Sequence, residues 1–312
     1  MKLHFNTLYL CMRKKYFSNL IKKNDFNFNS FLINKLNREI YENKKNKLNY
    51  SFINTKHSWH LVDPSPWPLI TAIGAFTITF SLVLYMHNYN YGNLLMINGF
   101  LILFYSTFMW WRDVIREATL EEQHSFSVQR SLRLGMLLFI VSEVMFFFAF
   151  FWAFFHSSLS PTFNIGGVWP PEAIEIIPSS GIPLTNTFFL LSSGVTVTWA
   201  HHAIISRAKK HAIVALIATL VLATLFTGLQ VLEYLEAPFT MTDSVYGSCF
   251  YITTGFHGFH VVIGTLFLFV SFVRIIFNHL TNSHHFGFEA GAWYWHFVGA
   301  TVQEKNLLKN IF

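Results

Sequence analysis

Histidine is the residue type whose chemistry stands out first, because this chain of 312 residues contains fifteen of them. Several are adjacent or closely spaced, at His201-His202, His257 and His260, His284-His285, and His296. Neutral imidazole is the commonest protein ligand for transition metals, so these groups raise the question of a metal site. The two cysteines, Cys11 and Cys249, lie in segments of very different composition and predict neither a disulfide framework nor a thiolate site.

The paired histidines are similar to the histidine boxes of membrane di-iron oxygenases, which gather their histidines at one membrane face. His257 and His260 lie well inside a long apolar stretch, whereas the other groups follow or end such stretches. We therefore expect hydrogen-bonded histidines and no metal bound by this chain. A di-iron oxygenase remains the alternative function.

Glu143 is the one formally charged residue inside the long apolar stretches. A carboxylate at membrane depth is expensive, so it should face other helices and pair with a polar group or stay protonated. A proton-linked or lipid-linked site and a neutral hydrogen bond between helices both fit this position. The sequence shows no partner or substrate pocket, so we expect no catalytic residue.

A second candidate site follows the aromatic pair Trp110-Trp111, where Arg112 and Arg116 are spaced one helical turn apart. Tryptophan favours the level of the lipid headgroups, and arginine can bind a phosphate with two parallel hydrogen bonds. The segment predicts either an ordinary interface anchor or a specific phospholipid site.

The elements that must position these residues are membrane spans, because 53% of the chain is hydrophobic and only 12% is charged. About 20 apolar residues cross a bilayer as a helix, and six stretches reach that length. They run approximately over 67–86, 93–111, 134–156, 184–206, 211–232 and 246–273. The fold class predicted is all-α, a polytopic transmembrane helical bundle.

Positive charge gives the orientation of these spans, since lysine and arginine remain on the side from which a membrane protein inserts. If successive spans alternate in direction, every lysine and arginine of the loops between the spans lies on one side of the membrane. The charged residues of the loops on the other side are all acidic. The N-terminal segment 1–56 is also basic, with twelve lysines and arginines against three acidic residues. We expect it on the same, matrix-like side, as a solvated tail that does not bind nucleic acid.

A seventh stretch begins at Phe286 but stays apolar only to Val298, which is too short to cross a membrane alone. Polar residues follow at once, and Lys305 and Lys309 would join the positive side. We therefore expect both ends of the chain on that side. Residues 299–312 would be a tail that stands in place of most of a seventh helix. Either this tail is translated from an unspliced intron, or a separately encoded chain supplies the seventh helix.

From Trp59 to Val298 the chain resembles the subunit III family of cytochrome c oxidase. The landmarks include HLVDPSPWP from His60, WWRDVIRE from Trp110, SEV from Ser142, FWAFFHSS from Phe151, TWAHH from Thr198, EAPFT from Glu236, GFHGFH from Gly255, and HHFGFEAGAWYWHFV from His284. Their order and spacing are far more specific than any single motif. Domains are thus predicted at 1–56, 57–298 and 299–312.

The resemblance implies seven helices in two bundles, which are separated by a cleft that holds phospholipids. It implies a subunit without haem or copper that packs on catalytic subunit I in the mitochondrial inner membrane. Such a subunit supports assembly, stability and proton uptake while the complex transfers electrons from cytochrome c to oxygen. By position, Glu143 resembles the intramembrane carboxylate of the family, and Trp111, Arg116 and Arg274 resemble positions near lipid headgroups.

Overall fold

The structure, a computed structural model, describes residues 58–310 except 173 and 179, and describes side chains as far as Thr301. The predicted N-terminal extension 1–56 therefore lies outside the described residues. The chain forms two units that divide after Trp59, and the helices of the described residues lie in the unit from His60 onward. These are α3 (Trp67–Met86), α4 (Gly92–Thr119), α5 (Phe126–Leu159), the short 3-10 helix η1 (Phe163–Ile165), α6 (Ile182–Ile205), α7 (Lys209–Glu236), α8 (Val245–Ile276) and α9 (Phe286–Asn310). The predicted all-α class is confirmed for the described residues, which contain no strand.

Six of the described helices, α3 to α8, are long and apolar enough to cross a membrane, which confirms the six predicted spans. Most helices extend beyond the apolar stretch that predicted them. Helix α5 has 34 residues and is thus about 51 Å long, well over the ~30 Å of a hydrocarbon core. Its added first turn begins where the side chain of Ser125 accepts a hydrogen bond from the backbone N–H of Val128.

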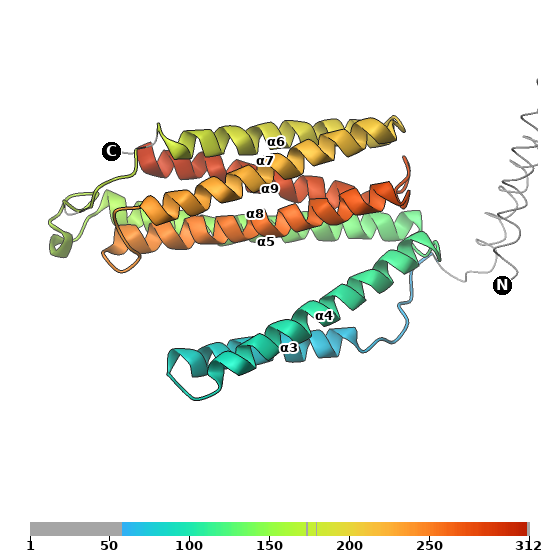
Figure 1. The fold of residues 1–312 in the computed structure, drawn as a ribbon, viewed down its shortest axis with the longest axis horizontal. Helices are drawn as coiled ribbons and strands as arrows, with labels where there is room; N and C mark the ends of the chain where they lie inside the picture. The colour runs from blue at the N-terminus through green and yellow to red at the C-terminus, as the bar shows by residue number, and fades with distance from the viewer. Residues whose placement is uncertain (1–57, 173, 179, 311–312) are drawn as a thin grey trace, which may run out of the picture. The chain divides into compact units, whose positions relative to one another are not determined.

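Helices α3 and α4 form a tight antiparallel pair because small residues line their contact. A Cβ atom added to Gly99 would lie 2.9 Å from Cγ1 of Ile78, and one added to Gly74 would lie 3.1 Å from the backbone nitrogen of Leu103. The hydroxyls of Thr71 and Ser106 are 3.0 Å apart across the same contact. Among the described residues, no Cα atom of this pair comes within 8 Å of another helix. The pair is therefore a separate bundle (Figure 1).

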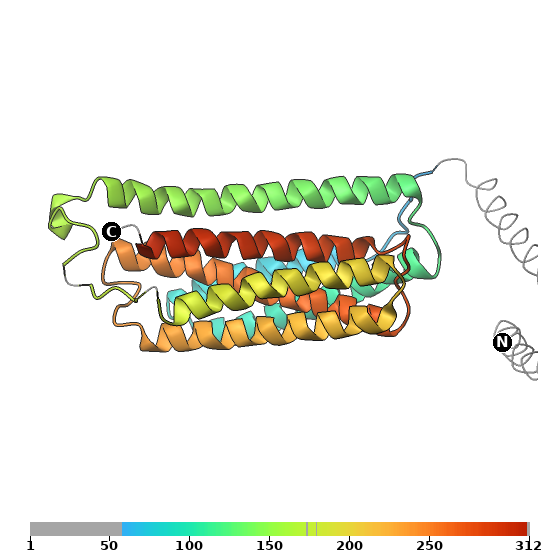
Figure 2. The same ribbon diagram turned by 90° about the horizontal axis from the view of Figure 1, so that it is seen from above.

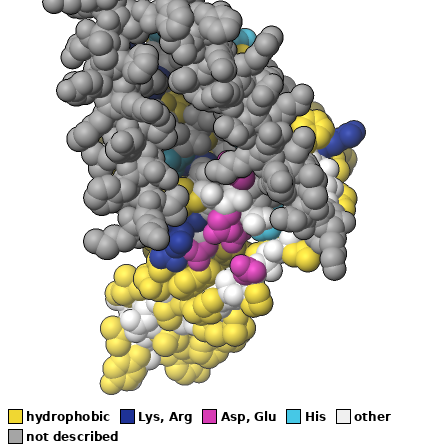
Figure 3. Space-filling view, turned by 90° about the vertical axis from the view of Figure 1, so that its right-hand side faces the viewer, with side chains coloured by type: hydrophobic (Ala, Val, Ile, Leu, Met, Phe, Trp, Pro, Cys, Tyr) yellow, Lys and Arg dark blue, Asp and Glu magenta, His cyan; other side chains and the backbone are white. Residues whose placement is uncertain are grey.

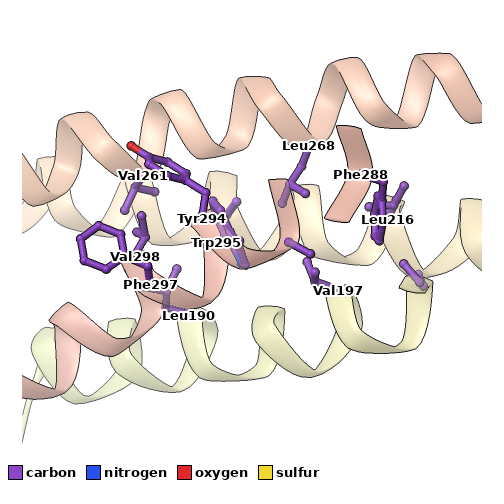
Figure 4. Close-up of a cluster of buried hydrophobic side chains, with 14 of the residues drawn as sticks. Leu190, Val197, Leu216, Val261, Leu268, Phe288, Tyr294, Trp295, Phe297 and Val298 are labelled. Carbon is purple, nitrogen blue, oxygen red and sulfur yellow. The ribbon is translucent and has the colours of Figure 1, made fainter. Parts of the chain in front are cut away.

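Helices α5 to α9 form the second bundle, in which α9 packs against α5, α6 and α8 (Figures 1 and 2). Trp295 of α9 is 1% exposed, and its indole N–H donates to the hydroxyl of Ser193 on α6 at 2.9 Å. Gly264 of α8 gives this indole room, since a Cβ there would lie 2.9 Å from the ring. Figure 4 shows Trp295 among the buried side chains of this core, which include Leu190, Val197, Leu216, Val261, Leu268, Phe288 and Val298.

The loops alternate between the two ends of the bundles (Figure 1). Loops 120–125, 206–208 and 277–285 lie at one end, which we call the basic end, and loops 87–91, 160–181 and 237–244 lie at the other, the acidic end. The basic residues whose side chains the structure describes are at or near the basic end: Arg112, Arg116, Arg130, Arg133, Arg207, Lys209, Lys210 and Arg274. Lys305 and Lys309 lie instead in the last turns of α9. Figure 3 looks at this end and shows charged side chains gathered beside a hydrophobic surface.

Helix α9 differs from the expectation of a half-span followed by a separate tail. It is one continuous helix of 25 residues, Phe286–Asn310, and at ~1.5 Å per residue it extends for about 37 Å. It begins at the basic end and finishes at the acidic end (Figure 1), so the expected return of the chain to the positive side is wrong. The length of the apolar stretch was a poor guide to the length of the helix, because a helix can continue through polar residues of high helix propensity. Gln, Glu, Lys and Leu, which follow Val298, are such residues.

Candidate functional site

Glu143 of α5 pairs with His260 of α8 near the middle of both helices. The distance from Nε2 of His260 to Oε2 of Glu143 is 2.9 Å. The side chain of His260 is 9% exposed and that of Glu143 is 21% exposed. The sequence showed no partner for Glu143, but both residues lie at mid-helix, and equal depth was the signal that could have paired them.

The aromatic neighbours hold this pair in place. The ring of Tyr294 on α9 stacks on His260, with centroids 6.2 Å apart, and the ring of Phe147 meets the imidazole edge-on at 5.1 Å. Nearby, Nε2 of His257 lies 3.2 Å from the carbonyl oxygen of Val298, and His257 is 2% exposed. His257 and His260 therefore have separate hydrogen-bonding partners, as expected of interior histidines.

The contacts of His260 indicate which of its ring nitrogens faces Glu143. Its Nδ1 lies 2.6 Å from the carbonyl oxygen of Phe256, which can only accept, so Nδ1 carries a hydrogen. The contact between Nε2 and Oε2 is a hydrogen bond when one further proton lies on the carboxyl of Glu143 or on the imidazole of His260. The pair can thus pass one proton between two side chains inside the membrane.

The candidate lipid residues lie towards the basic end. Trp111 of α4 is 53% exposed, and its ring meets Phe267 of α8 edge-on with centroids 6.1 Å apart. The two bundles therefore touch here through side chains. Arg116 is exposed at the end of α4, whereas Arg112 is engaged by Asp113 at 2.7 Å. The two arginines therefore differ, because Arg112 is in an ion pair whereas Arg116 is exposed and available for a headgroup.

Arg274, in the last turn of α8, is a cation without an acidic partner among the described ion pairs. Its Nε is buried and has no hydrogen-bond partner in the described part of the chain. Gly287 makes room for it, because a Cβ there would lie 2.6 Å from one guanidinium nitrogen. An arginine held in this way suits a phosphate group, which takes two parallel hydrogen bonds from a guanidinium.

A further set of titratable side chains gathers at the basic end, outside the spans. Nε2 of His60 lies 3.6 Å from a carboxylate oxygen of Glu117, and the rings of His60 and His124 are 6.0 Å apart. Gln129 contacts His284 at 2.9 Å and donates to the carbonyl oxygen of His124 at 3.1 Å. Burial, and then the nearby His60, lower the pKa of His124 below its ordinary value.

Two of the histidines considered as metal ligands also come together at this end. One ligand atom each from His201, His285 and Glu289 lies within 4.8 Å of the others. This group was not predicted from the sequence, because its third member is a glutamate rather than a histidine. The spacing of His285 and Glu289, four residues apart where α9 begins, was the signal that could have found it.

Comparison with known proteins supports the resemblance stated above. The family model for cytochrome c oxidase subunit III matches residues 57–302. The chain is 60% identical over 243 residues to cytochrome c oxidase subunit 3 of Pylaiella littoralis, covering 78% of this chain and 89% of that protein. It is 59% identical to the Prototheca wickerhamii protein and 58% identical to the Arabidopsis thaliana protein, each over 243 residues and 78% of this chain, with 93% and 92% of those proteins covered.

Proposed function

Because the chain belongs to the cytochrome c oxidase subunit III family, we propose that it is a non-redox subunit of a terminal respiratory oxidase. The complex transfers electrons from cytochrome c to oxygen and pumps protons, and haem and copper belong to its other subunits. This chain packs on catalytic subunit I and supports the assembly, stability and proton uptake of that subunit.

The observation that carries the proton-linked part of this proposal is the contact between Glu143 and His260. A carboxylate and an imidazole 2.9 Å apart can share or release a proton, which an apolar bundle without titratable groups could not do. The Glu143 side chain is accessible, since 21% of it is exposed on the surface of this bundle, whereas His260 is buried. A neutral hydrogen bond that only fixes packing would not need this access.

Phospholipid binding is the second part of the proposal. The exposed ring of Trp111, the exposed Arg116 and the unpaired Nε of Arg274 lie towards the basic end, at the level where headgroups meet water. The acyl chains would lie between the two bundles, whose Cα atoms keep more than 8 Å apart in the described part of the chain.

We place the chain in the mitochondrial inner membrane, with the basic end facing the matrix. The charge distribution supports this orientation, because all the basic residues between His60 and Thr301 are at or near the end that holds loops 120–125, 206–208 and 277–285. Single cysteines in loop 120–125 and in loop 237–244, labelled in sealed vesicles of known orientation, would test it. Labelling of the second loop from the matrix side would reverse the assignment.

Co-purification tests the assembly itself. A tagged chain should bring down subunits that carry haem and copper, identified by their absorption spectrum and by metal analysis. Stoichiometric non-haem iron in the isolated chain, without haem, would contradict the proposal and favour the di-iron oxygenase.

A further inference from the structure

His201, His285 and Glu289 form a compact group where α6 and α9 meet at the basic end. His285 directly precedes α9, and its Nε2 lies 3.1 Å from Oε1 of Glu289 in the first turn of that helix. The ring of His201 on α6 lies edge-on to that of His285, with centroids 5.5 Å apart. One nitrogen or carboxylate oxygen from each residue lies within 4.8 Å of the other two.

The hydrogen bonds around this group leave lone pairs facing one another. Nδ1 of His285 lies 3.1 Å from the carbonyl oxygen of Thr281, so this nitrogen carries the hydrogen and Nε2 of the neutral ring is an acceptor. Nε2 thus faces Oε1 of Glu289, which is also an acceptor when ionised. Nε2 of His201 is buried and has no hydrogen-bond partner within the described residues. A cation between these atoms would satisfy all three.

Arg133 of α5 prepares Glu289 for this role. Its Nε donates to Oε2 at 2.8 Å, and one terminal nitrogen donates to Oε1 at 3.3 Å, so the carboxylate is held ionised and in a fixed orientation. The stronger contact is to Oε2, which leaves Oε1 facing His285. The group is enclosed, since His285 is 7% exposed and the side chain of Glu289 is 13% exposed. Buried ligands held in place by neighbouring hydrogen bonds are typical of metal sites.

We propose that His201, His285 and Glu289 bind one divalent transition metal ion, best Zn²⁺, which ties α6 to α9. Zinc accepts two imidazole nitrogens and one carboxylate oxygen with a water as fourth ligand. Ligands at zinc bond lengths of ~2.1 Å in a tetrahedron are about 3.4 Å apart, close to the 3.1 Å between His285 and Glu289. A ligand atom of His201 lies within 4.8 Å of both other ligand atoms. This inference does not rest on the proposed function of the chain.

Zinc titration of the intact purified oxidase tests the site, with His202→Gln as the matched control for His201→Gln. His202 adjoins His201 on α6 but is exposed and lies outside the group of three. After treatment with a chelator and dialysis against Zn²⁺, the wild type and His202→Gln should retain one more zinc per complex than His201→Gln. Equal zinc content in all three would overturn the proposal and leave an ion pair between protonated His285 and Glu289.

A spectroscopic measurement keeps the test decisive if His201→Gln does not assemble. The zinc K-edge absorption of the wild-type complex, before and after chelation, isolates the ion that this treatment removes. The spectrum of that ion should fit two imidazole ligands together with oxygen ligands, without sulfur. A sulfur-only environment, or no change on chelation and reloading, would contradict the site.

Discussion

Nε2 of His260 faces Glu143 across the contact between α8 and α5, because Nδ1 of His260 is committed to the carbonyl oxygen of Phe256 at 2.6 Å. The remaining contact, at 2.9 Å, joins Nε2 to a carboxylate oxygen and accommodates either a neutral pair or an ion pair. The two forms have the same net charge, so the interior of the bundle can change between them without importing charge.

Glu143→Gln should leave assembly largely intact but shorten the working life or slow the proton uptake of the oxidase. Glutamine keeps hydrogen-bonding capacity and removes titration. The measurement is the number of turnovers before inactivation, together with proton uptake in reconstituted vesicles. Loss of assembly, with normal specific activity in the residual enzyme, would show that the pair only fixes packing.

The energetic coupling of the same pair can be measured separately. A double-mutant cycle of Glu143→Gln and His260→Gln should give a coupling of about 0.6 kcal/mol and at most ~1.7 kcal/mol, the range found between membrane helices. Thermal unfolding of the complex at fixed detergent supplies the four stabilities. Strictly additive effects would mean that the two side chains do not interact.

Arg274→Ala should reduce the phospholipid that remains with the purified complex, because it removes a guanidinium whose Nε has no partner in the described part of the protein. Arg116→Ala should act in the same direction. Arg112→Ala is the matched control, since Asp113 already engages Arg112 at 2.7 Å. Mass spectrometry of the extracted lipid reports the result, and equal lipid content in all three variants would argue against a headgroup site.

Gly99→Ala should weaken the α3–α4 pair, because its methyl group would meet Ile78 at 2.9 Å. We expect a loss of ~1–3 kcal/mol, the usual result of overpacking. Gly135→Ala on α5 is the control, since nothing lies within 4 Å of its added Cβ and alanine favours a helix by about 1 kcal/mol. Thermal unfolding compares the two variants. Equal stabilities of Gly99→Ala and Gly135→Ala would show that the contact between α3 and α4 accommodates the added methyl group.

The six spans were predictable because the thickness of a bilayer sets the length of the apolar stretch that crosses it. The distribution of lysine and arginine predicted which loops share an end. Helix ends were less predictable, since the first two turns of α5 contain Gln129, Arg130 and Arg133, polar residues that a helix tolerates and an apolar window excludes. Helix α9 was misjudged for the same reason. Apolar length measures what a membrane requires, whereas helix length follows from backbone hydrogen bonds.

The candidate sites were predictable one residue at a time and not as pairs. Glu143 stood out as a charge at membrane depth, but its partner is 117 residues away on another helix. His201 and Glu289 are likewise joined only by the packing of α6 on α9. Such contacts depend on the rotation of each helix about its axis, which a single sequence with apolar residues on nearly all sides does not fix.

His124 predicts how the basic end responds to acid. Burial lowers its pKa, and the neighbouring His60, His284 and Arg274 lower it further, so the folded protein binds this proton less readily than the unfolded chain. Between the ordinary histidine value of about 6.5 and the lower folded value, the unfolded state holds more protons, and stability therefore falls as the pH falls. His124→Gln should reduce this loss, because it removes the group whose protonation opposes folding. The check is the melting temperature of the purified oxidase from about pH 7.5 down to pH 5, compared with His279→Gln, which removes a histidine at the same end. An identical pH dependence in wild type and His124→Gln would contradict the prediction and assign the acid sensitivity to other groups.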